Sequence, residues 1–265
     1  MEEVFSTMKV LIIGMVNLKV IPPIAWTGLK PGSAGGLKPG GVACYSSKNL
    51  TDWKFEGKVL PTVDDDPTSD LHPSQVIERP KVIYNEKTGK FVMWMHIESP
   101  DYEKAHAGVA VCDSPTGTFT YLGSFKPNGA DSRDQTIFKD DDGKAYHICS
   151  SEWNSTLYIS LLTDDYTKPS GTYVRRFIGQ SREAPAVFKR NGHYYMLSSG
   201  CTGWDPNKAK WAVSDSMMGV WELKDNPVWG VMPIRHFMPK VPTYSPLKGC
   251  RINLSLCLTG GIKRI

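Results

Sequence analysis

The sequence has no aspartate or glutamate in two long stretches, Val4 to Thr51 and Asn226 to Ile265. Between them, residues 52–225 hold 25 acidic residues against 20 Lys and Arg, so the net charge of +4 comes entirely from the two flanks. Tails that bind nucleic acid are rich in Lys and Arg, whereas these flanks consist mostly of apolar residues, glycine and proline. The basic balance therefore does not indicate a nucleic-acid partner.

Metal-ligand spacings, helical periods and membrane-length apolar runs are also missing. The six cysteines are scattered, and Cys250 and Cys257 lie in an acid-free flank, so we expect no disulfide framework, no metal and no cofactor. The "DDDG" at 140–143 lacks the spacing of a calcium loop and is better explained as a hairpin turn. No apolar run is long enough to span a membrane. The lack of a helical period favours an all-β domain.

Pairs of β-like runs joined by turn signals recur along the chain. In "SREAPAVFKRNGHYYML", residues 181–197, Asn-Gly joins two such runs, which is the strongest short-range signal for a hairpin. Similar hairpins are expected in "ERPKVIYNEKTGKFVMW" and "RDQTIFKDDDGKAYHI". A second hairpin follows each of the three, and "GVACYSSKNLTDWKFEG" is an earlier copy that has lost its first half. Each unit of about 50 residues therefore has the size and the four strands of a propeller blade.

One acid precedes the first strand of each complete unit. These acids are Glu78, Asp134 and Glu183, and successive ones are 56 and 49 residues apart. The innermost strands of propeller blades start near the central axis, so we expect the three carboxylates to converge on one cavity. Mutual repulsion should raise the pKa of at least one of them and so provide a proton donor. The alternative is that each acid only caps a turn or pairs with the arginine beside it in the sequence.

Three motifs, "ERPKVIYN", "SRDQTIFKDDDGKAY" and "SREAPAVFKRNGHYYML", resemble glycoside hydrolase family 43, and within it the branch of exo-β-1,3-galactanases. The resemblance covers residues 41–227, with the motifs in the right order and spacing. It implies a five-bladed propeller that cleaves plant polysaccharide with inversion, in which Glu183 is the general acid. Asp134 would tune the pKa of that acid and orient it, and Glu78 would contact the sugar. Water would attack from the face opposite the acid.

Aromatic and polar residues near the inner hairpins fit a sugar site. Propellers also pack tryptophan between blades, so Trp94, Trp153 and Trp204 are each more often core than ligand. Trp204, in the loop "SSGCTGWDPN", is the best exposed candidate for stacking on a sugar. The resemblance further implies substrate contacts by polar residues of the same rim, namely Glu152, Asn154 and Thr202.

The genetic code offers an explanation for the acid-free flanks. Suppose that the flanks are translated out of frame, so that each original codon consists of the third base of one present codon and the first two bases of the next. Read in that original frame, "LIIGMVN" at 11–17 can encode Tyr-Tyr-Trp-Tyr-Gly-Glu. In the same way "RHFMPKVPT" at 235–243 admits Thr-Phe-His-Ala-Gln-Ser-Thr-Tyr. Both match what the galactanase branch carries in its first and fifth blades. We therefore expect the flanks 4–40 and 228–265 to be frame-shifted and either irregular or poorly determined, with the first and fifth blades disrupted.

The shifted frame has a direct chemical consequence. In the branch resembled, a glutamine of the fifth blade positions the attacking water, and here it would lie at the junction of the Pro239 and Lys240 codons. The residues of the chain do not encode it. The alternatives to galactan cleavage are thus an arabinan- or xylan-cleaving relative with the same carboxylates, a propeller that binds glycan without cleaving it, and a protein-interaction propeller.

The remaining expectations concern organisation. We predict one propeller domain over 1–265, with reliable blades at about 41–227, acting as a monomer on polysaccharide or oligosaccharide and not on a membrane. The family implies a secreted or periplasmic location. The run "MKVLIIGMV" imitates a signal-peptide core but lacks a cleavage-site pattern, so it is explained better as the first blade out of frame, with the true start upstream.

Overall fold

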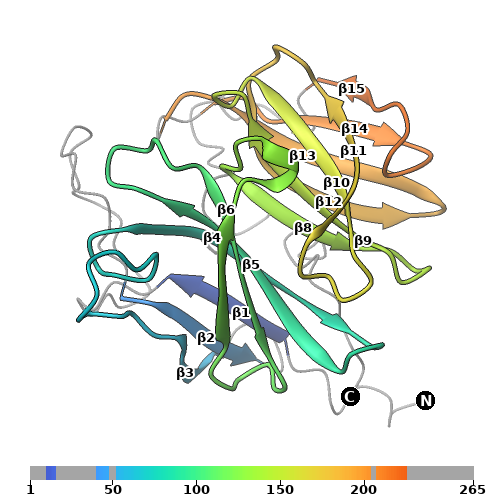
Figure 1. Cartoon of the computed structure of the whole chain (residues 1–265). Coiled ribbons are helices and arrows are strands. Elements are labelled where there is room, and N and C mark those ends of the chain that lie inside the picture. The colour runs from blue at the N-terminus through green and yellow to red at the C-terminus, as the bar shows by residue number, and fades with distance from the viewer. Residues whose placement is uncertain (1–9, 16–39, 48–51, 204–206, 226–265) are drawn as a thin grey trace, which may run out of the picture. The chain divides into compact units, whose positions relative to one another are not determined.

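The computed structural model describes residues 10–15, 40–47, 52–203 and 207–225 (Figure 1). Its strands are β1 (Val10–Met15), β2 (Val42–Ser47), β3 (Lys54–Leu60), β4 (Val76–Asn85), β5 (Lys90–Glu98), β6 (His106–Cys112), β7 (Thr120–Phe125), β8 (Gln135–Lys139), β9 (Ala145–Ser151), β10 (Thr156–Leu162), β11 (Pro169–Arg176), β12 (Arg182–Arg190), β13 (His193–Gly200), β14 (Lys210–Ser214) and β15 (Glu222–Lys224). A single turn of 3-10 helix, η1 (Pro127–Gly129), precedes β8. Within these ranges no helix has the length and apolar character that crossing a membrane requires.

The strands form four antiparallel sheets in which consecutive strands pair. Three sheets have four strands each, β4 to β7, β8 to β11 and β12 to β15, and the sheet of β1 to β3 has three. These sheets contain the hairpins that the sequence predicts, including the second hairpin of each unit. Four-stranded meanders of this size are the building unit of propellers.

The hairpin turns also follow the sequence signals. Asn191 (φ +51°) and Gly192 (φ +82°) both have positive φ, as a two-residue turn between β12 and β13 requires. Asp140 to Gly143 form the turn between β8 and β9, in which the Gly143 N–H donates to the Asp140 carbonyl at 3.1 Å. The prediction of a hairpin turn at "DDDG" is therefore confirmed.

The described chain divides into two compact units, the first containing β1 to β7 and the second η1 and β8 to β15. Each unit has its own core, built by apolar side chains from both of its sheets. In β13 of the second unit, Tyr194 and Met196 are buried and alternate with less buried neighbours, which is the period of two expected for a strand. The strands next to the inner edge, β5 and β9, are buried almost throughout. The inner strands therefore lie in apolar surroundings, where a charged side chain needs specific partners.

One short part of the first flank is regular. Residues 10–15 lie in the flank predicted to be irregular or poorly determined, yet they form β1, which pairs with β2 from Val10↔Ser47 to Met15↔Val42. The run "VLIIGM" is apolar and contains Val and two Ile, residue types that suit a strand whichever reading frame is the original one. Most other residues of this flank, and all of 228–265, lie outside the described residues.

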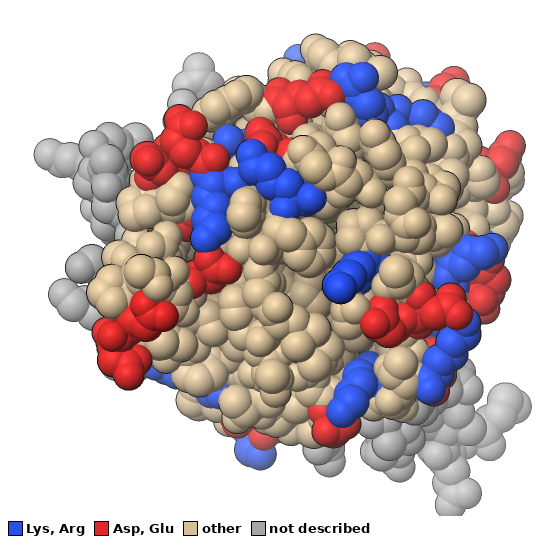
Figure 2. Space-filling view, in the orientation of Figure 1, with Lys and Arg blue, Asp and Glu red and all other residues tan. Residues whose placement is uncertain are grey.

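Charged side chains of both signs are interspersed on the face shown in Figure 2. Elsewhere along the chain, charged side chains form ion pairs, such as Lys90 with Asp113 at 2.6 Å and Lys126 with Asp131 at 2.8 Å. Exposed pairs of this kind contribute little to stability. Their mixing agrees with the near balance of charges in residues 52–225.

Candidate active site

Glu183 lies at a β-bulge near the start of β12. The pairing of β12 with β13 shifts register between Glu183 and Ala186. Ala184 has φ +49°, and Pro185 has no N–H to contribute to the sheet. A bulge changes the direction in which a side chain points, so the Ala-Pro step after the acid has a structural reason.

Glu78 lies at the same kind of bulge near the start of β4. Here the register with β5 shifts between Glu78 and Lys81, Arg79 has φ +53°, and Pro80 follows it. Two of the three predicted acids thus share a local conformation, acid–X–Pro at a bulge. Asp134 differs, because it directly precedes β8 and no proline follows it.

Glu183 is 6% exposed, and two side chains donate hydrogen bonds to the same oxygen of its carboxylate. Asn154 Nδ2 donates to Oε1 at 2.9 Å, and Cys201 Sγ donates to it at 3.2 Å. Asn154 comes from the loop between β9 and β10, and Cys201 directly follows β13. The orientation of the carboxyl group is therefore set by two loops of the second unit.

Asp134 is fixed beside the bulge. Its Oδ2 accepts the backbone N–H of Ala184 at 3.1 Å, and its own carbonyl accepts the N–H of Ser150 in β9 at 2.9 Å. The Asp134 carboxylate thus contacts Ala184, the residue that follows Glu183. These two predicted acids lie together, as the sequence led us to expect.

The arginine next to Glu183 does not supply the simple pairing considered as an alternative. Arg182 is buried, and its Nε and NH2 donate to the hydroxyl and the carbonyl of Ser198 at 3.1 and 2.7 Å. Burial lowers the pKa of this guanidinium, while the nearby charge of Glu183 acts in the opposite direction. Arg182 therefore braces β12 against β13 at the acid.

The loop between β9 and β10 has an unusual backbone. Three successive residues, Glu152, Trp153 and Asn154, have φ of +52°, +55° and +64°. Each such residue other than glycine costs on the order of 1–3 kcal/mol, and such residues cluster at functional sites. The loop holds Asn154 against Glu183 in this strained conformation.

The Glu152 side chain stabilises that loop. Its carboxylate accepts hydrogen bonds from Thr156 Oγ1 at 2.7 Å and from Tyr158 OH at 2.9 Å, and it pairs with Arg175 at 2.5 Å. The hydrogen bonds from Thr156 and then Arg175 lower the pKa of Glu152. The loop is thereby tied to β10 and β11.

The loop after β13 is closed by an asparagine that the sequence analysis did not single out. Asn207 brackets Gly200, accepting its N–H at 2.7 Å and donating to its carbonyl at 3.0 Å. It also donates to the hydroxyl of Thr202, which is exposed, at 2.7 Å. Trp204 lies outside the described residues.

The two other tryptophans considered from the sequence differ in exposure. Trp94 is fully buried in β5 and packs edge-on against Phe125, so it belongs to the core. Trp153 is 67% exposed, and the guanidinium carbon of Arg133 lies 4.5 Å from the centre of its ring. Trp153 is thus an exposed aromatic residue of the second unit.

In the first unit, Glu78 is held by a histidine and a tyrosine. His96 Nδ1 lies 3.2 Å from Glu78 Oε2, and Tyr102 OH donates to Oε1 at 3.1 Å. On its other side, His96 Nε2 lies 3.2 Å from Glu98 Oε2. Burial of His96 opposes its charge, but the hydrogen bonds to Glu78 and Glu98 outweigh burial and raise the pKa of the imidazole.

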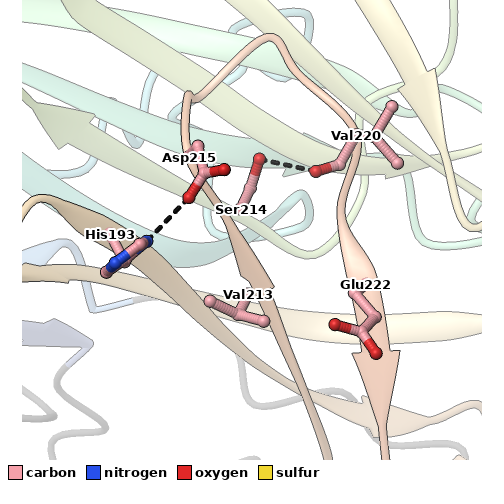
Figure 3. A pocket seen from close by; sticks show the side chains of 6 residues that line it. All are labelled: His193, Val213, Ser214, Asp215, Val220 and Glu222. Atoms are coloured by element: carbon pink, nitrogen blue, oxygen red, sulfur yellow. Dashed lines mark hydrogen bonds and ion pairs between the residues drawn. The ribbon is translucent and has the colours of Figure 1, made fainter.

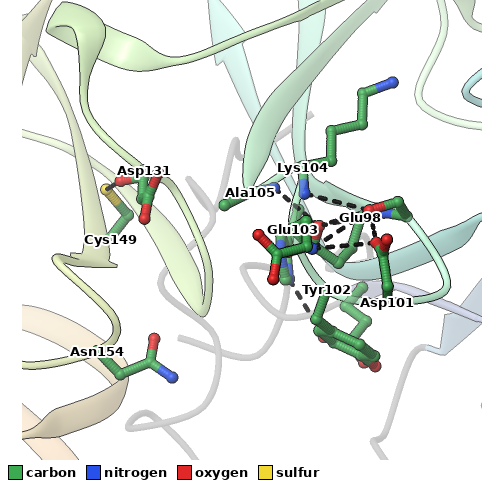
Figure 4. A network of polar contacts seen from close by, with 12 residues as sticks. Glu98, Asp101, Tyr102, Glu103, Lys104, Ala105, Asp131, Cys149 and Asn154 are labelled. Atoms are coloured by element: carbon green, nitrogen blue, oxygen red, sulfur yellow. Dashed lines mark hydrogen bonds and ion pairs between the residues drawn. The ribbon is translucent and has the colours of Figure 1, made fainter.

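Glu98 is itself fully buried and held by backbone groups. It accepts the N–H groups of Ser99 at 3.1 Å and Ala105 at 2.8 Å, within the network drawn in Figure 4. Burial raises the pKa of Glu98, but hydrogen bonds from His96 and the backbone outweigh this effect and lower it. His96 is thus held between two carboxylates.

Sequence reasoning missed Cys201, Asn207 and His96. Cys201 was visible in "SSGCTGWDPN", but only its neighbours were considered. His96 and Glu98 are the polar residues at the otherwise apolar end of β5. They are two positions apart and so lie on the same face of the strand. This pattern could have indicated a buried polar pair.

A hollow of about 300 Å³ lies on the sheet of β12 to β15, lined by residues of β13 to β15 and the loop before β15 (Figure 3). It contains no predicted site residue, and His193 and Asp215 form an ion pair on its wall at 2.7 Å. Its lining residues are His193, Val213, Ser214, Asp215, Val220 and Glu222.

Comparison with known proteins agrees with the geometry. The sequence profile of glycosyl hydrolases family 43 matches residues 34–230, and no curated protein matches. A family 43 β-1,3-galactosidase, solved with galactodeoxynojirimycin, is 40% identical, with a TM-score of 0.71. That match covers 74% of this chain and 73% of the other.

Two exo-β-1,3-galactanases are also similar. The enzyme from Clostridium thermocellum is 43% identical (TM-score 0.66; 71% of this chain and 42% of that one). The enzyme from Phanerochaete chrysosporium, solved with galactose, is 39% identical (TM-score 0.66; 70% and 43%). The chain therefore spans less than half the length of either galactanase. The likeness confirms the predicted fold class, a five-bladed propeller, present here incompletely, with three four-stranded blades and one of three strands among the described residues.

Proposed function

The chain belongs to glycosyl hydrolases family 43, and we propose that within this family it is an exo-β-1,3-galactanase. The family makes it a glycosidase that acts on oligosaccharide or polysaccharide. The finer assignment is supported by three similar structures, each named for β-1,3-galactoside or β-1,3-galactan cleavage, at 39–43% identity.

The observation that carries the proposal is the setting of Glu183. A general acid must hold its proton on an oxygen directed at the leaving group. Oε1 already accepts hydrogen bonds from Asn154 and Cys201, and an oxygen with two donors has little room for a proton. The proton of the neutral acid therefore belongs on Oε2, which is the oxygen that protonates the glycosidic bond.

Asp134 acts on this acid through charge. A carboxylate disfavours ionisation of a second carboxyl group nearby. Because Asp134 is tied to the Ala184 N–H at 3.1 Å, its charge stays beside the acid while substrate enters and product leaves. Asp134 is thus the modulating carboxylate.

The remaining predicted residues divide by their contacts. Glu78 and Thr202 are assigned to substrate binding, as is Trp204. Asn154 orients the acid through Oε1 and reaches the sugar from the same loop. Glu152 has both oxygens engaged by Thr156, Tyr158 and Arg175, so it supports the site by holding this loop.

A second candidate function is a propeller that binds glycan without cleaving it. The specific observation in its favour is the sequence around Pro239 and Lys240, which lacks the glutamine that the family's galactanase branch uses to position water. Such a protein would keep the acid and its modulator but would have no group to activate the nucleophile.

Release of reducing sugar separates these functions. The chain is incubated with β-1,3-galactan, arabinan and xylan, and binding of each is measured in parallel. Galactose release from galactan alone supports the galactanase. Binding of galactan without release supports the binding propeller, and release from arabinan or xylan alone contradicts the galactan assignment.

A further inference from the structure

The Trp153 ring lies against a buried arginine, while most of the residue is exposed. The guanidinium carbon of Arg133 lies 4.5 Å from the ring centre, and Arg133 itself is only 6% exposed. A buried cation thus supports the ring from beneath, while two thirds of the residue's surface faces solvent. Burial of a cation under an exposed indole gives the ring a fixed orientation.

Two sequence neighbours connect this ring with the acid Glu183. Trp153 directly precedes Asn154, whose amide reaches Glu183 at 2.9 Å. Arg133 directly precedes Asp134, whose carboxylate reaches Ala184 at 3.1 Å. Both members of the stacked pair are therefore one residue from a group that contacts the bulge, and from this adjacency we infer that the ring lies at the rim of the site.

The backbone around the ring is restrained as well. Trp153 is the middle one of three residues with positive φ, a conformation that bulky side chains rarely adopt. Glu152 fixes the turn through Thr156, Tyr158 and Arg175. A ring that is already immobile loses little entropy when a ligand packs on it.

We propose that Trp153 is a stacking platform for the sugar on the leaving-group side of the bond that Glu183 protonates. One face of a galactose ring is a patch of C–H groups, because its axial hydroxyl points to the other face, and such a patch packs on an indole. The open ring at the rim suits the sugar that departs toward solvent, whereas the sugar being released as galactose has to meet the buried carboxylates. This inference rests on the proposed function.

Binding tests the platform in the full, frame-restored chain. Glu183→Gln is present throughout so that the triose is not cleaved, and "wild-type" below refers to position 153 alone. Affinities for β-1,3-galactotriose and for galactose are measured by calorimetry on the wild-type chain, Trp153→Ala and Trp153→Phe. Loss of the indole should weaken the affinity for the triose about tenfold and change the affinity for galactose less than twofold. Contacts with an aromatic ring contribute a free energy of about this size. Trp153→Phe should stay within about threefold for both sugars. Trp53→Ala, which removes another exposed tryptophan, should change neither.

Indole fluorescence gives a second readout on the same chains. Galactotriose should shift the emission of the wild-type chain more than galactose does, and the difference between the two sugars should be missing in Trp153→Phe, in which Trp204 still responds to both. If the wild-type chain binds both sugars and Trp153→Ala binds them equally well, or loses both alike, the platform is wrong while the proposed function stands. If the wild-type chain binds neither sugar, the proposed function and the platform fail together.

Discussion

Asn154 donates its side-chain amide to Oε1 of Glu183 at 2.9 Å, although 28 residues separate the two in the sequence. The bond joins a strained loop to a bulged strand. It lets the conformation of the loop decide how the acid is oriented, so changes at either end should alter catalysis. The kinetic predictions below refer to the frame-restored protein, in which both flanks are read in the shifted frame.

Replacing Glu183 by glutamine should lower turnover of β-1,3-galactan by about 10²–10⁴-fold, because general acid catalysis contributes that much. Oligosaccharide binding should survive. Substrates with good leaving groups should lose much less, since they need no proton. Initial rates on galactan and on an aryl galactoside measure this, and Glu222→Gln, on the edge strand of the same sheet, is the control. Equal losses on both substrates would contradict the role.

Asp134→Asn should move the alkaline limb of the pH–rate profile to lower pH and also lower the rate. The variant loses the charge that keeps the neighbouring acid protonated, but its amide oxygen can still accept the Ala184 N–H. Profiles of kcat/KM between pH 4 and 9 give the result, with Asp131→Asn as the control for a nearby carboxylate. An unmoved limb would leave Asp134 with a structural role only.

Asn154→Ala should move the same limb to higher pH. A hydrogen bond donated to a carboxyl oxygen favours the ionised form, so its removal favours the protonated one. The rate at the optimum pH should also fall, because Cys201 is then the only one of these two donors that still orients the Glu183 carboxyl group. Asn128→Ala is a matched control, since Asn128 also has positive φ (+53°) and a side-chain bond to Ser160. A limb that moves the same way in both variants would refute the assignment.

His96 should make the stability of the first unit depend on pH. Its pKa is raised in the folded chain, so its contribution is fully present below the unfolded value of about 6.5 and is lost as pH rises through the folded pKa. His96→Gln should lower the free energy of unfolding by on the order of 3 kcal/mol at pH 6 and by less at pH 9. Urea unfolding at both pH values measures this. His193→Gln, which removes an exposed pair with Asp215, should have little effect at either pH.

The flanks allow a test of the reading frame. Expressed as printed, the chain should aggregate or be cleaved by protease at both ends, because an incomplete propeller exposes strand edges and apolar faces. The frame-restored protein should be soluble and compact. Limited proteolysis with mass spectrometry measures this, and resequencing the gene around codons 3, 40 and 227 provides an independent check. Equal resistance of both versions would count against the shift.

The sequence predicted what depends on local signals. Asn191-Gly192 fixed a hairpin turn, and the acids before β4, β8 and β12 were found from their positions relative to these hairpins. The side-chain contacts made by the loops could not be predicted, since they depend on register, bulges and the points where strands end. Cys201 reaches Glu183 only because β13 ends where it does, and Trp153 is exposed only because its turn has a left-handed backbone.

The proline at the bulge in β12 has a consequence for how the sequence can evolve. Pro185 cannot donate to the sheet, so β12 cannot slip by one residue at that point, and such a slip would turn Val187 out of the core. Folding therefore preserves the bulge whether or not the chain performs chemistry. A descendant that lost catalysis would be free to exchange Glu183 yet would keep the proline, so the motif would outlast the activity it once served.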